Sequence, residues 1–492
     1  MATSDSNRGF SAVLTNAPFR SLWGAQLLAQ SSQNAINFVQ LVLIEQLTGS
    51  AMLQGLVILA FTLPGVIFSP IAGVVVDRFS KKSVLVISNF GRVFFTLCYV
   101  FALTALHGTW ELIAIYLISF LNASLAQFFY PAEAATIPAL VGNDKLLTAN
   151  SLFNLTMTVA QVVGMLVLGP LVSFLFNVRV GFLILAVLTL GAAVLVSRLP
   201  HDSAVSHERV DGMLRWLAVW HEAVEGWRFV SGQPVVKVAT AFMVTINTLV
   251  MVLAMVMPGF AARVLGMAAQ SAVIVFVPAF AGMLLATALV GRWGRWLRRV
   301  GAVYLGLALV GVAFAALGFA SLDYQRLMQP ILRVYPHLTF SLVSVTMVLG
   351  FIIGLSLSAV NILSQTAMQE ESPSHMRGRV FSVLFMLNAL VGIPPMLALG
   401  EVADRIGIPR VLVIVGVVTI LIAGLSFADR RVNGLVQWVK VNGQAFLRRP
   451  MTTTPPPGPA QPPVVRQSPS EANGRDGTHA LVEEREETKE SS

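Results

Sequence analysis

The stretch Gly73-Val-Val-Val-Asp77-Arg78-Phe-Ser-Lys81-Lys82 joins two long hydrophobic segments, one ending near Val76 and the next beginning near Ser83. It carries four charged side chains within the six residues from Asp77 to Lys82, so it lies where membrane meets water. Three of the four charges are basic, and Lys and Arg accumulate on the cytoplasmic side of membrane proteins. The sequence therefore places this connection on the cytoplasmic face.

Asp77 is the unusual charge in this stretch, because a carboxylate at the C-terminal end of a helix opposes the dipole of that helix. It needs a second partner, such as the N-terminus of another helix or a cation. The pattern of Gly, three residues, acid, base and a basic pair resembles the signature loop between helices 2 and 3 of the major facilitator superfamily of secondary transporters. The stretch from Met376 to Ser382 resembles the start of span 11 in that family. The resemblance implies an inner gate formed by Gly73, Asp77, Arg78, Lys81, Lys82, Arg377 and Gly378.

The composition excludes an ordinary soluble protein. The chain has 492 residues, 55% hydrophobic and 12% charged, with a mean hydropathy of +0.75. Soluble domains carry about twice that charged fraction. At about 20 residues per span, twelve candidate spans follow one another, so we expect an all-α membrane protein of twelve transmembrane helices. The expected spans are 22–46, 51–76, 83–106, 112–130, 147–176, 181–196, 238–261, 271–290, 300–320, 338–363, 380–402 and 411–427.

A polar break divides these spans into two six-helix halves. We expect a cytoplasmic tail at 1–20, a first half at 21–197, a linker at 198–235, a second half at 236–428 and a mostly disordered cytoplasmic tail at 429–492. In the linker, apolar residues from Met213 to Trp227 recur at helical spacing. They predict an amphipathic helix that lies either on the inner membrane face or on the cytoplasmic side of the protein itself.

The two halves resemble each other in sequence. Sliding the first half along the chain lays Arg78, Lys81 and Lys82 on Arg295, Arg298 and Arg299, while Asp77 falls on Gly294. A second match aligns Asn150, at the start of span 5, with Gly378, at the start of span 11. Parallel repeats with the substrate between them near the membrane midplane are the arrangement that the family resemblance implies.

The distribution of Lys and Arg sets the orientation. Six of the 33 fall in connections on the outer side, namely Arg179, Arg263, Arg326, Arg333, Arg405 and Arg410, whereas nearly all the others fall on the opposite side. We therefore expect both termini in the cytoplasm and the protein in the plasma (inner) membrane. The net charge of +9 follows from this topology, so no nucleic-acid partner is expected.

Two further features concern the branch of the family. Residues 222–234, EAVEGWRFVSGQP, resemble linkers of drug- and siderophore-efflux members, the branch that includes macrolide and enterobactin exporters. The run from Gly164 to Gly169-Pro170 has one residue more between its glycines than the Gly-x-x-x-Gly-Pro of antiporter members, and span 4 lacks the arginine that many members carry. Both departures argue against proton antiport, whereas the family as a whole implies it.

Amide side chains are frequent in spans that line the substrate cavity in this superfamily. Polar groups avoid lipid, so an amide-rich face either lines a cavity or bonds neighbouring helices to one another. Six amides on span 1 exceed what interhelical bonding requires, which favours the cavity. The predicted cavity residues are Gln26, Gln30, Gln33, Asn34, Asn37 and Gln40 in span 1, Asn122 and Gln127 in span 4, Asn247 in span 7 and Asn361 in span 10.

Few charges lie inside the spans. Arg92 is about ten residues into span 3, or about 15 Å deep, near the middle of a hydrocarbon core about 30 Å thick. It is either a functional charge or half of a structural ion pair, for instance with Glu133 near the inner end of span 4. Glu45, at the outer end of span 1, is the third candidate charge.

These features predict a secondary active transporter that exports a small amphipathic organic compound, neutral or anionic, such as a drug or siderophore. The family resemblance implies alternating access, a proton as coupling ion, contact with membrane lipid and a monomer. A lysolipid or lipid flippase of the same fold and a sensor or scaffold that does not transport are the alternatives. The sequence shows no catalytic constellation, metal cluster or cofactor motif, so we expect no enzyme, no metal and no cofactor. The single cysteine, Cys98, excludes a disulfide framework.

Overall fold

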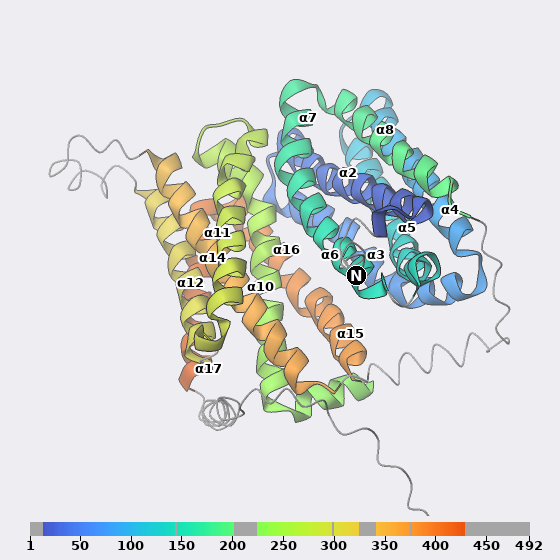
Figure 1. Cartoon of the computed structure of the whole chain (residues 1–492). Coiled ribbons are helices and arrows are strands. Elements are labelled where there is room, and N and C mark those ends of the chain that lie inside the picture. The colour runs from blue at the N-terminus through green and yellow to red at the C-terminus, as the bar shows by residue number, and fades with distance from the viewer. Residues whose placement is uncertain are drawn as a thin grey trace, which may run out of the picture. The chain divides into compact units, whose positions relative to one another are not determined.

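The computed structural model describes residues 13–142, 145–200, 224–297, 300–323, 341–373 and 376–428. All regular elements in these ranges are helices. The helices of each half form a bundle, α2–α8 in the first and α10–α17 in the second (Figure 1). Most of the predicted linker helix, the connection around Arg326 and Arg333, and the C-terminal tail lie outside the described residues.

Four helices in the described part of the first half begin with a side-chain N-cap. Asn16, Ser50, Ser80 and Asn177 accept hydrogen bonds from the first-turn amides of the helices that follow them, which satisfies donors that a helix leaves free. Its helices are α2 (Ala17–Thr48), α3 (Ala51–Arg78), α4 (Lys81–Ala105), α5 (Thr109–Val141), α6 (Leu146–Val162), the π-helix η2 (Val163–Leu168), α7 (Gly169–Leu175) and α8 (Val178–Ser197).

The second half repeats this order with more interruptions. Its elements are α10 (Pro234–Gly259), the π-helix η3 (Phe260–Val264), the short 3-10 helix η4 (Ala269–Ala272), α11 (Val273–Leu297), α12 (Val300–Leu322), α14 (Leu342–Glu371), α15 (Arg377–Leu387), the π-helix η5 (Asn388–Gly392), α16 (Ile393–Ile406) and α17 (Ile408–Ala428). Residues 224–232 are helical as well and form the described end of the predicted linker helix.

Eleven helices in the described ranges are long and apolar enough to cross a membrane, when interrupted helices are joined. The remaining long helix is α2, whose amides lower its hydropathy. At 32 residues it is about 48 Å long, which exceeds a hydrocarbon core of about 30 Å. It packs against α8, α6 and η2 inside the first bundle. The predicted all-α fold with twelve transmembrane helices is therefore confirmed.

One predicted boundary is wrong by three turns. Span 4 was expected to end at Tyr130, but α5 continues to Val141 with Pro131 and Pro138 inside it. In the sequence, the two prolines and the charged Glu133 make this segment resemble the end of a membrane span. The helix persists because neighbouring helices bury it, and tertiary packing overrides the cost of helix-breaking residues in membrane helices. Glu133 consequently lies inside a helix.

The same pairs of helices pack together in both halves. In the first half, α3 packs on α5 and α4 on α8; in the second, α11 packs on α14 and α12 on α17. These are the second with the fourth span and the third with the sixth in each case. The predicted internal repeat is thus visible in the packing as well as in the sequence.

The extra residue between Gly164 and Gly169 is accommodated by η2. A π-helix has a wider turn than an α-helix, so it inserts one residue without rotating the helix that follows. Both glycines consequently face α2: a Cβ on Gly164 would lie 2.4 Å from the Ser31 carbonyl oxygen, and one on Gly169 would lie 2.8 Å from the Phe38 ring. The close approach of these helices requires glycine at both positions.

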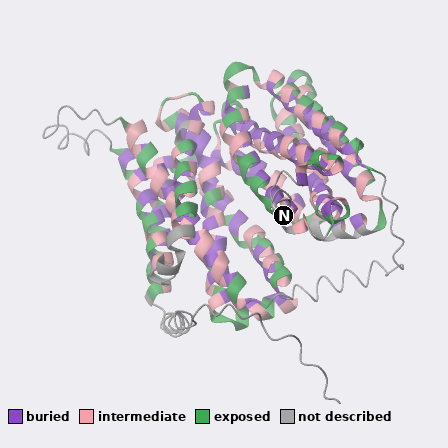
Figure 2. Cartoon of the chain, viewed as in Figure 1, coloured by how far each residue is buried: buried purple, intermediate pink, exposed green. Residues whose placement is uncertain are grey.

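Burial follows the pattern of a membrane bundle. Buried residues lie where helices meet, and many exposed side chains on the described helices are large and apolar, such as Phe94, Phe101 and Phe319 (Figure 2). Exposed aromatic and aliphatic surface is unfavourable in water and favourable in hydrocarbon. The outer surface of the bundles is therefore suited to lipid.

Candidate functional site

The amides of α2 divide into two stripes. Gln26, Gln33 and Gln40, spaced by seven residues, are at most 9% exposed and form the buried stripe. Gln30, Asn34 and Asn37 are partly exposed and form the open stripe. Residues seven apart lie on nearly the same side of a helix, so the single broad face expected from the sequence is two adjacent faces. Gln33 and Gln40 of the buried stripe bond to side chains of α4, whereas the amide atoms of Gln26 have no described partner. The open stripe is the partly exposed part of this amide-rich surface.

The two stripes are connected by hydrogen bonds. The Gln33 amide donates to Asn37 Oδ1 over 3.0 Å, and the Asn34 amide donates to the Gln30 carbonyl over 2.9 Å. The Tyr130 hydroxyl, from α5, donates to Gln30 Oε1 over 3.2 Å. Hydrogen bonds within α2 and from Tyr130 of α5 thus position the side chains of the open stripe.

Arg92 supports the buried stripe from α4. Its Nη2 donates to Gln33 Oε1 over 2.9 Å and to the Ala29 carbonyl over 3.3 Å, and the residue is only 2% exposed. Gln33 therefore accepts from a buried guanidinium and donates to the open stripe. A buried charge is in this way connected to Asn37 of the open stripe through two hydrogen bonds, both of them made by Gln33.

Glu133, on α5, lies within electrostatic range of Arg92 and is 2% exposed. The described contacts include no direct ion pair between them, and Glu133 Oε1 and Arg92 Nε have no hydrogen-bond partner among the described groups. Both groups are buried, so the charge of one depends on the charge of the other. The direct ion pair that one interpretation of Arg92 predicts is thus not among the described contacts, and its role as a functional charge stays a prediction.

The other predicted cavity residues lie at different depths. Asn122 is buried and donates to Thr96 Oγ1 over 3.3 Å, while Gln127 is partly exposed and donates to the Ala123 carbonyl of its own helix over 3.5 Å. Asn247 is partly exposed and donates to Asn388 Oδ1 over 3.4 Å. Asn361, on α14, is also partly exposed.

The inner gate is described only in part. The side chains of Gly73 and Asp77 are outside the described ones, and α3 ends at Arg78. At the other side of the predicted gate, α15 begins at Arg377 and makes its main contacts with α10 and η5, and a Cβ added to Gly378 would meet nothing within 4 Å. Glu225 and Arg379 form an ion pair of 2.9 Å that ties residues 224–232 to α15.

The outer ends of the two halves meet in a polar cluster that sequence reasoning missed except for Glu45. The Arg263 side chain, in η3, has its Nε 3.2 Å from Glu45 Oε1 and its Nη1 3.7 Å from Asp404 Oδ1, and Gln54 donates to Glu45 Oε2. We call Glu45, Gln54, Arg263 and Asp404, with the N-terminus of α3, the outer latch. It connects α2 and α3 of the first half with η3 and α16 of the second.

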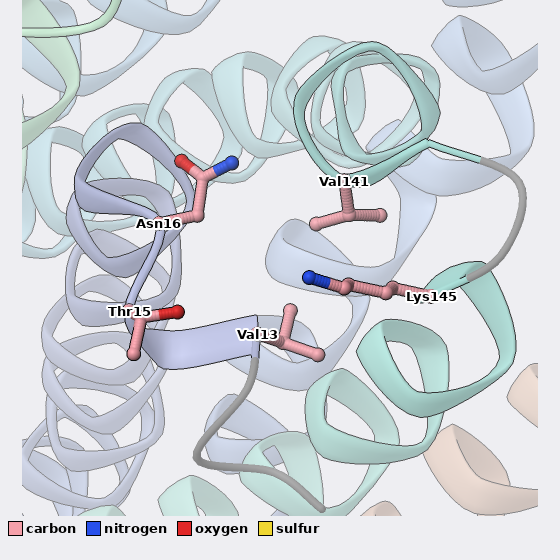
Figure 3. Close-up of a pocket in the computed structure, with 5 residues that line it drawn as sticks. All are labelled: Val13, Thr15, Asn16, Val141 and Lys145. Carbon is pink, nitrogen blue, oxygen red and sulfur yellow. The ribbon is translucent and has the colours of Figure 1, made fainter. Parts of the chain in front are cut away.

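Two small cavities lie inside the first half, away from the predicted amides. One, of about 210 Å³, lies between the start of α2 and the start of α6, and the Lys145 ammonium points into it (Figure 3). The other, of about 260 Å³, lies at the outer end near Glu111 and Arg179. Sites for drug-sized ligands measure about 300–1,000 Å³, so neither is suited to such a compound.

Comparison with known families gives one match over most of the chain. Residues 22–394 match the model of the Major Facilitator Superfamily. The uncharacterized MFS-type transporter YfiS of Bacillus subtilis is 22% identical over 397 residues, which cover 79% of this chain and 87% of the relative. The enterobactin exporter EntS of Shigella boydii is 29% identical over 168 residues, which cover 33% of this chain and 39% of that exporter.

Solved structures share the fold at low sequence identity. The nucleoside transporter NupG has a TM-score of 0.61 and 16% identity, covering 84% of this chain and 98% of its own. A POT family transporter in complex with a thioalcohol-conjugated peptide has a TM-score of 0.60 and 11% identity, covering 85% of this chain and 96% of its own. At these identities the likeness concerns the fold alone.

Proposed function

Because this chain belongs to the Major Facilitator Superfamily, we propose that it is a secondary active transporter that exports a small amphipathic organic compound, neutral or anionic, by alternating access. The observation that carries the proposal is the open stripe of α2, to which Arg92 is connected through the Gln33 side chain. The stripe offers amide donors and acceptors on a helix whose other faces are packed. Such groups suit a ligand with several hydrogen-bonding atoms.

The charge balance near the stripe favours neutral or anionic ligands. A cation taken out of water needs a fixed negative partner, since an unpaired buried charge is costly. Glu133 is the carboxylate that could best serve as the negative partner of a cationic ligand. Arg92 is within electrostatic range of it, however, and balances its charge. The pair therefore leaves no net negative charge for a lipophilic cation.

Export is proposed from the branch resemblance of the linker and from the match to the enterobactin exporter. That match covers about two fifths of the exporter, so it supports the direction of transport and a siderophore-like or drug-like class of cargo without naming the compound. A macrolide or a siderophore has the size and the hydrogen-bonding groups that the open stripe would contact.

We place both termini in the cytoplasm and the protein in the plasma membrane, because Lys and Arg are concentrated in the connections on one side. Single cysteines at His107 and Gly458 in a Cys98→Ala background test this topology. An impermeant thiol reagent added to intact cells should label the cysteine at position 107 and leave the one at 458 unlabelled. Labelling at 458 would contradict the orientation.

Proton coupling is proposed to run through Glu133. Its buried carboxyl has one oxygen without a described partner, and the Arg92 guanidinium lies within electrostatic range of it. A movement of α4 against α5 during transport would weaken that interaction, so Glu133 would take up a proton in one state and lose it in the other. Glu45 is less suited, because the outer latch engages both of its oxygens.

A susceptibility and accumulation screen tests the function. Cells with and without the protein are loaded with a panel of macrolides, siderophores, lysolipids and lipophilic cations, and the retained amounts are compared. Lower retention of a neutral or anionic amphipath in cells with the protein supports export. A change confined to lysolipid distribution would replace it by the flippase alternative, and no change in any compound would favour the sensor or scaffold.

A further inference from the structure

The pattern of the inner gate occurs a second time in the chain. Gly73-Val-Val-Val-Asp77-Arg78 ends α3, and Gly400-Glu-Val-Ala-Asp404-Arg405 lies in the last turns of α16. Both are Gly-x-x-x-Asp-Arg at the C-terminal end of a helix. With both termini inside, α3 ends at the inner side of the membrane and α16 ends at the outer side. The two copies therefore stand at opposite ends of the bundle.

Asp404 makes the kind of contact that the sequence predicts for Asp77. Its Oδ1 accepts from the Ala51 amide over 2.7 Å, and its Oδ2 accepts from the Ser50 hydroxyl over 2.6 Å and the Met52 amide over 3.1 Å. The three donors are at the N-terminus of α3, which belongs to the other half. A carboxylate is unfavourable at the end of its own helix and favourable at the start of another, so this contact joins the halves.

Gly400 allows the close approach that this contact needs. A Cβ at Gly400 would lie 2.9 Å from the Met52 Cα and 3.2 Å from the Ala51 carbonyl oxygen, both backbone atoms that cannot move aside. The glycine of the second copy thus has a defined role in the packing of α16 on α3. Arg263 adds the second connection, because it contacts Glu45 of one half and Asp404 of its own.

We propose that the second Gly-x-x-x-Asp-Arg copy is an outer gate that opposes the inner gate, with the same two spans exchanging one aspartate contact for the other. In the closed outer gate, Asp404 of the eleventh span caps α3, the second span. In the closed inner gate, Asp77 of the second span caps α15, the start of the eleventh. The structure holds the outer contact. The inference rests on the alternating access proposed above.

Labelling of a buried position between the halves tests the outer gate without any substrate. Met255, on α10, is 0% exposed, and its Sδ lies 3.1 Å from where a Cβ on Gly55 of α3 would be. A Met255→Cys, Cys98→Ala protein in proteoliposomes is reacted with an impermeant maleimide from the outer side. Asp404→Ala removes the charged acceptor of three hydrogen bonds and should speed labelling about tenfold.

Three further variants complete the test. Glu401→Ala, on the same helix, removes only the exposed pair with Arg405 and should leave the labelling rate unchanged. Arg263→Gln should speed labelling in the same direction as Asp404→Ala and serves if the latter does not fold. Asp77→Asn combined with Asp404→Ala should return the rate toward that of the parent, because each change then releases one of two opposing gates.

The outcomes separate the gate from a merely structural contact. An unchanged rate in both Asp404→Ala and Arg263→Gln, or an equal increase in Glu401→Ala, would overturn the proposal. A double variant that labels as fast as Asp404→Ala alone would also overturn it, since a structural defect is not reversed by a second loss. Failure of the export proposal leaves these rates unaffected, because no cargo is present.

Discussion

The two halves of the molecule share a packing pattern and differ in what they bury. The first half buries amides and charges, among them Gln26, Gln33, Asn89, Arg92 and Glu133. In the described part of the second half, the buried polar side chains carry hydroxyls and no amide or charge: Thr240, Ser271, Thr346, Ser356, Ser358, Ser364, Ser372 and Thr419. Several of these hydroxyls can bond to the carbonyl one turn back, as Thr346 and Thr419 do.

This difference in buried groups indicates that the two halves have different roles. A hydroxyl bonded to its own helix needs no partner across the bundle, whereas a buried amide or guanidinium does. We infer that the groups able to respond to a ligand or a proton are concentrated in the first half, where amides and charges are buried. The inner gate follows the same division, since Asp77 in the first half corresponds to Gly294 in the second.

Replacement of Glu133 should have the largest effect. Glu133→Gln keeps the shape of the side chain and cannot exchange a proton, so proton-driven accumulation in inside-out vesicles should be lost while exchange of cargo down its own gradient continues. Glu371→Gln is the matched control, because that carboxylate ends α14 at the inner surface of the second half. Retained proton-driven accumulation in Glu133→Gln would remove this residue from the coupling.

Replacement of Asp77 comes next. Asp77→Asn should keep insertion and abundance and lower cargo flux about tenfold, because losing a charge-assisted contact to a helix N-terminus costs about 1.5–3 kcal/mol in one state of the cycle. The measurement is efflux from loaded cells, normalised to protein in the membrane. Gly294→Asp restores the acid in the second half and should not rescue Asp77→Asn. Full activity of Asp77→Asn would remove the inner gate from the mechanism.

The smallest expected effects are on stability, and they should differ between a variant of the first half and a variant of the second. Gln33→Leu leaves the Arg92 guanidinium without its side-chain acceptor, which should cost about 1–3 kcal/mol of unfolding free energy. Asn361→Ala changes a partly exposed position of α14 and should cost less than about 0.5 kcal/mol. Thermal unfolding of the purified proteins compares the two. Equal losses would show that the buried amides of the first half are not distinctive.

Much of the fold was predictable because hydrophobic length and the positions of Lys and Arg are properties of the sequence alone. The length of α5 was not, since Pro131 and Glu133 are tolerated only by virtue of their neighbours. The amides of span 1 were identified by type and spacing. Their division into two stripes was not predictable, because it depends on which helices pack against each side of α2.

The outer latch shows a different limit of sequence reasoning. Glu45 was recognised as a charge inside a span, but its partner Arg263 is distant in the chain, and only the fold brings them together. A signal for Asp404 was present, since Gly400 to Arg405 repeats the pattern of Gly73 to Arg78. The pattern occurs at the ends of spans 2 and 11, which do not occupy equivalent positions in the two halves. A comparison of equivalent spans therefore does not detect it.

The most direct test of the central claim is paired efflux of two compounds of opposite character. An ethidium-like cation and an anionic or neutral amphipath are loaded into the same cells, and their export is measured for the wild type and for Arg92→Gln. The open stripe and the balanced charge of Arg92 and Glu133 predict export of the amphipath and not of the cation, with anionic flux reduced in Arg92→Gln. Export of the cation alone, with anionic flux unchanged in Arg92→Gln, would contradict the account.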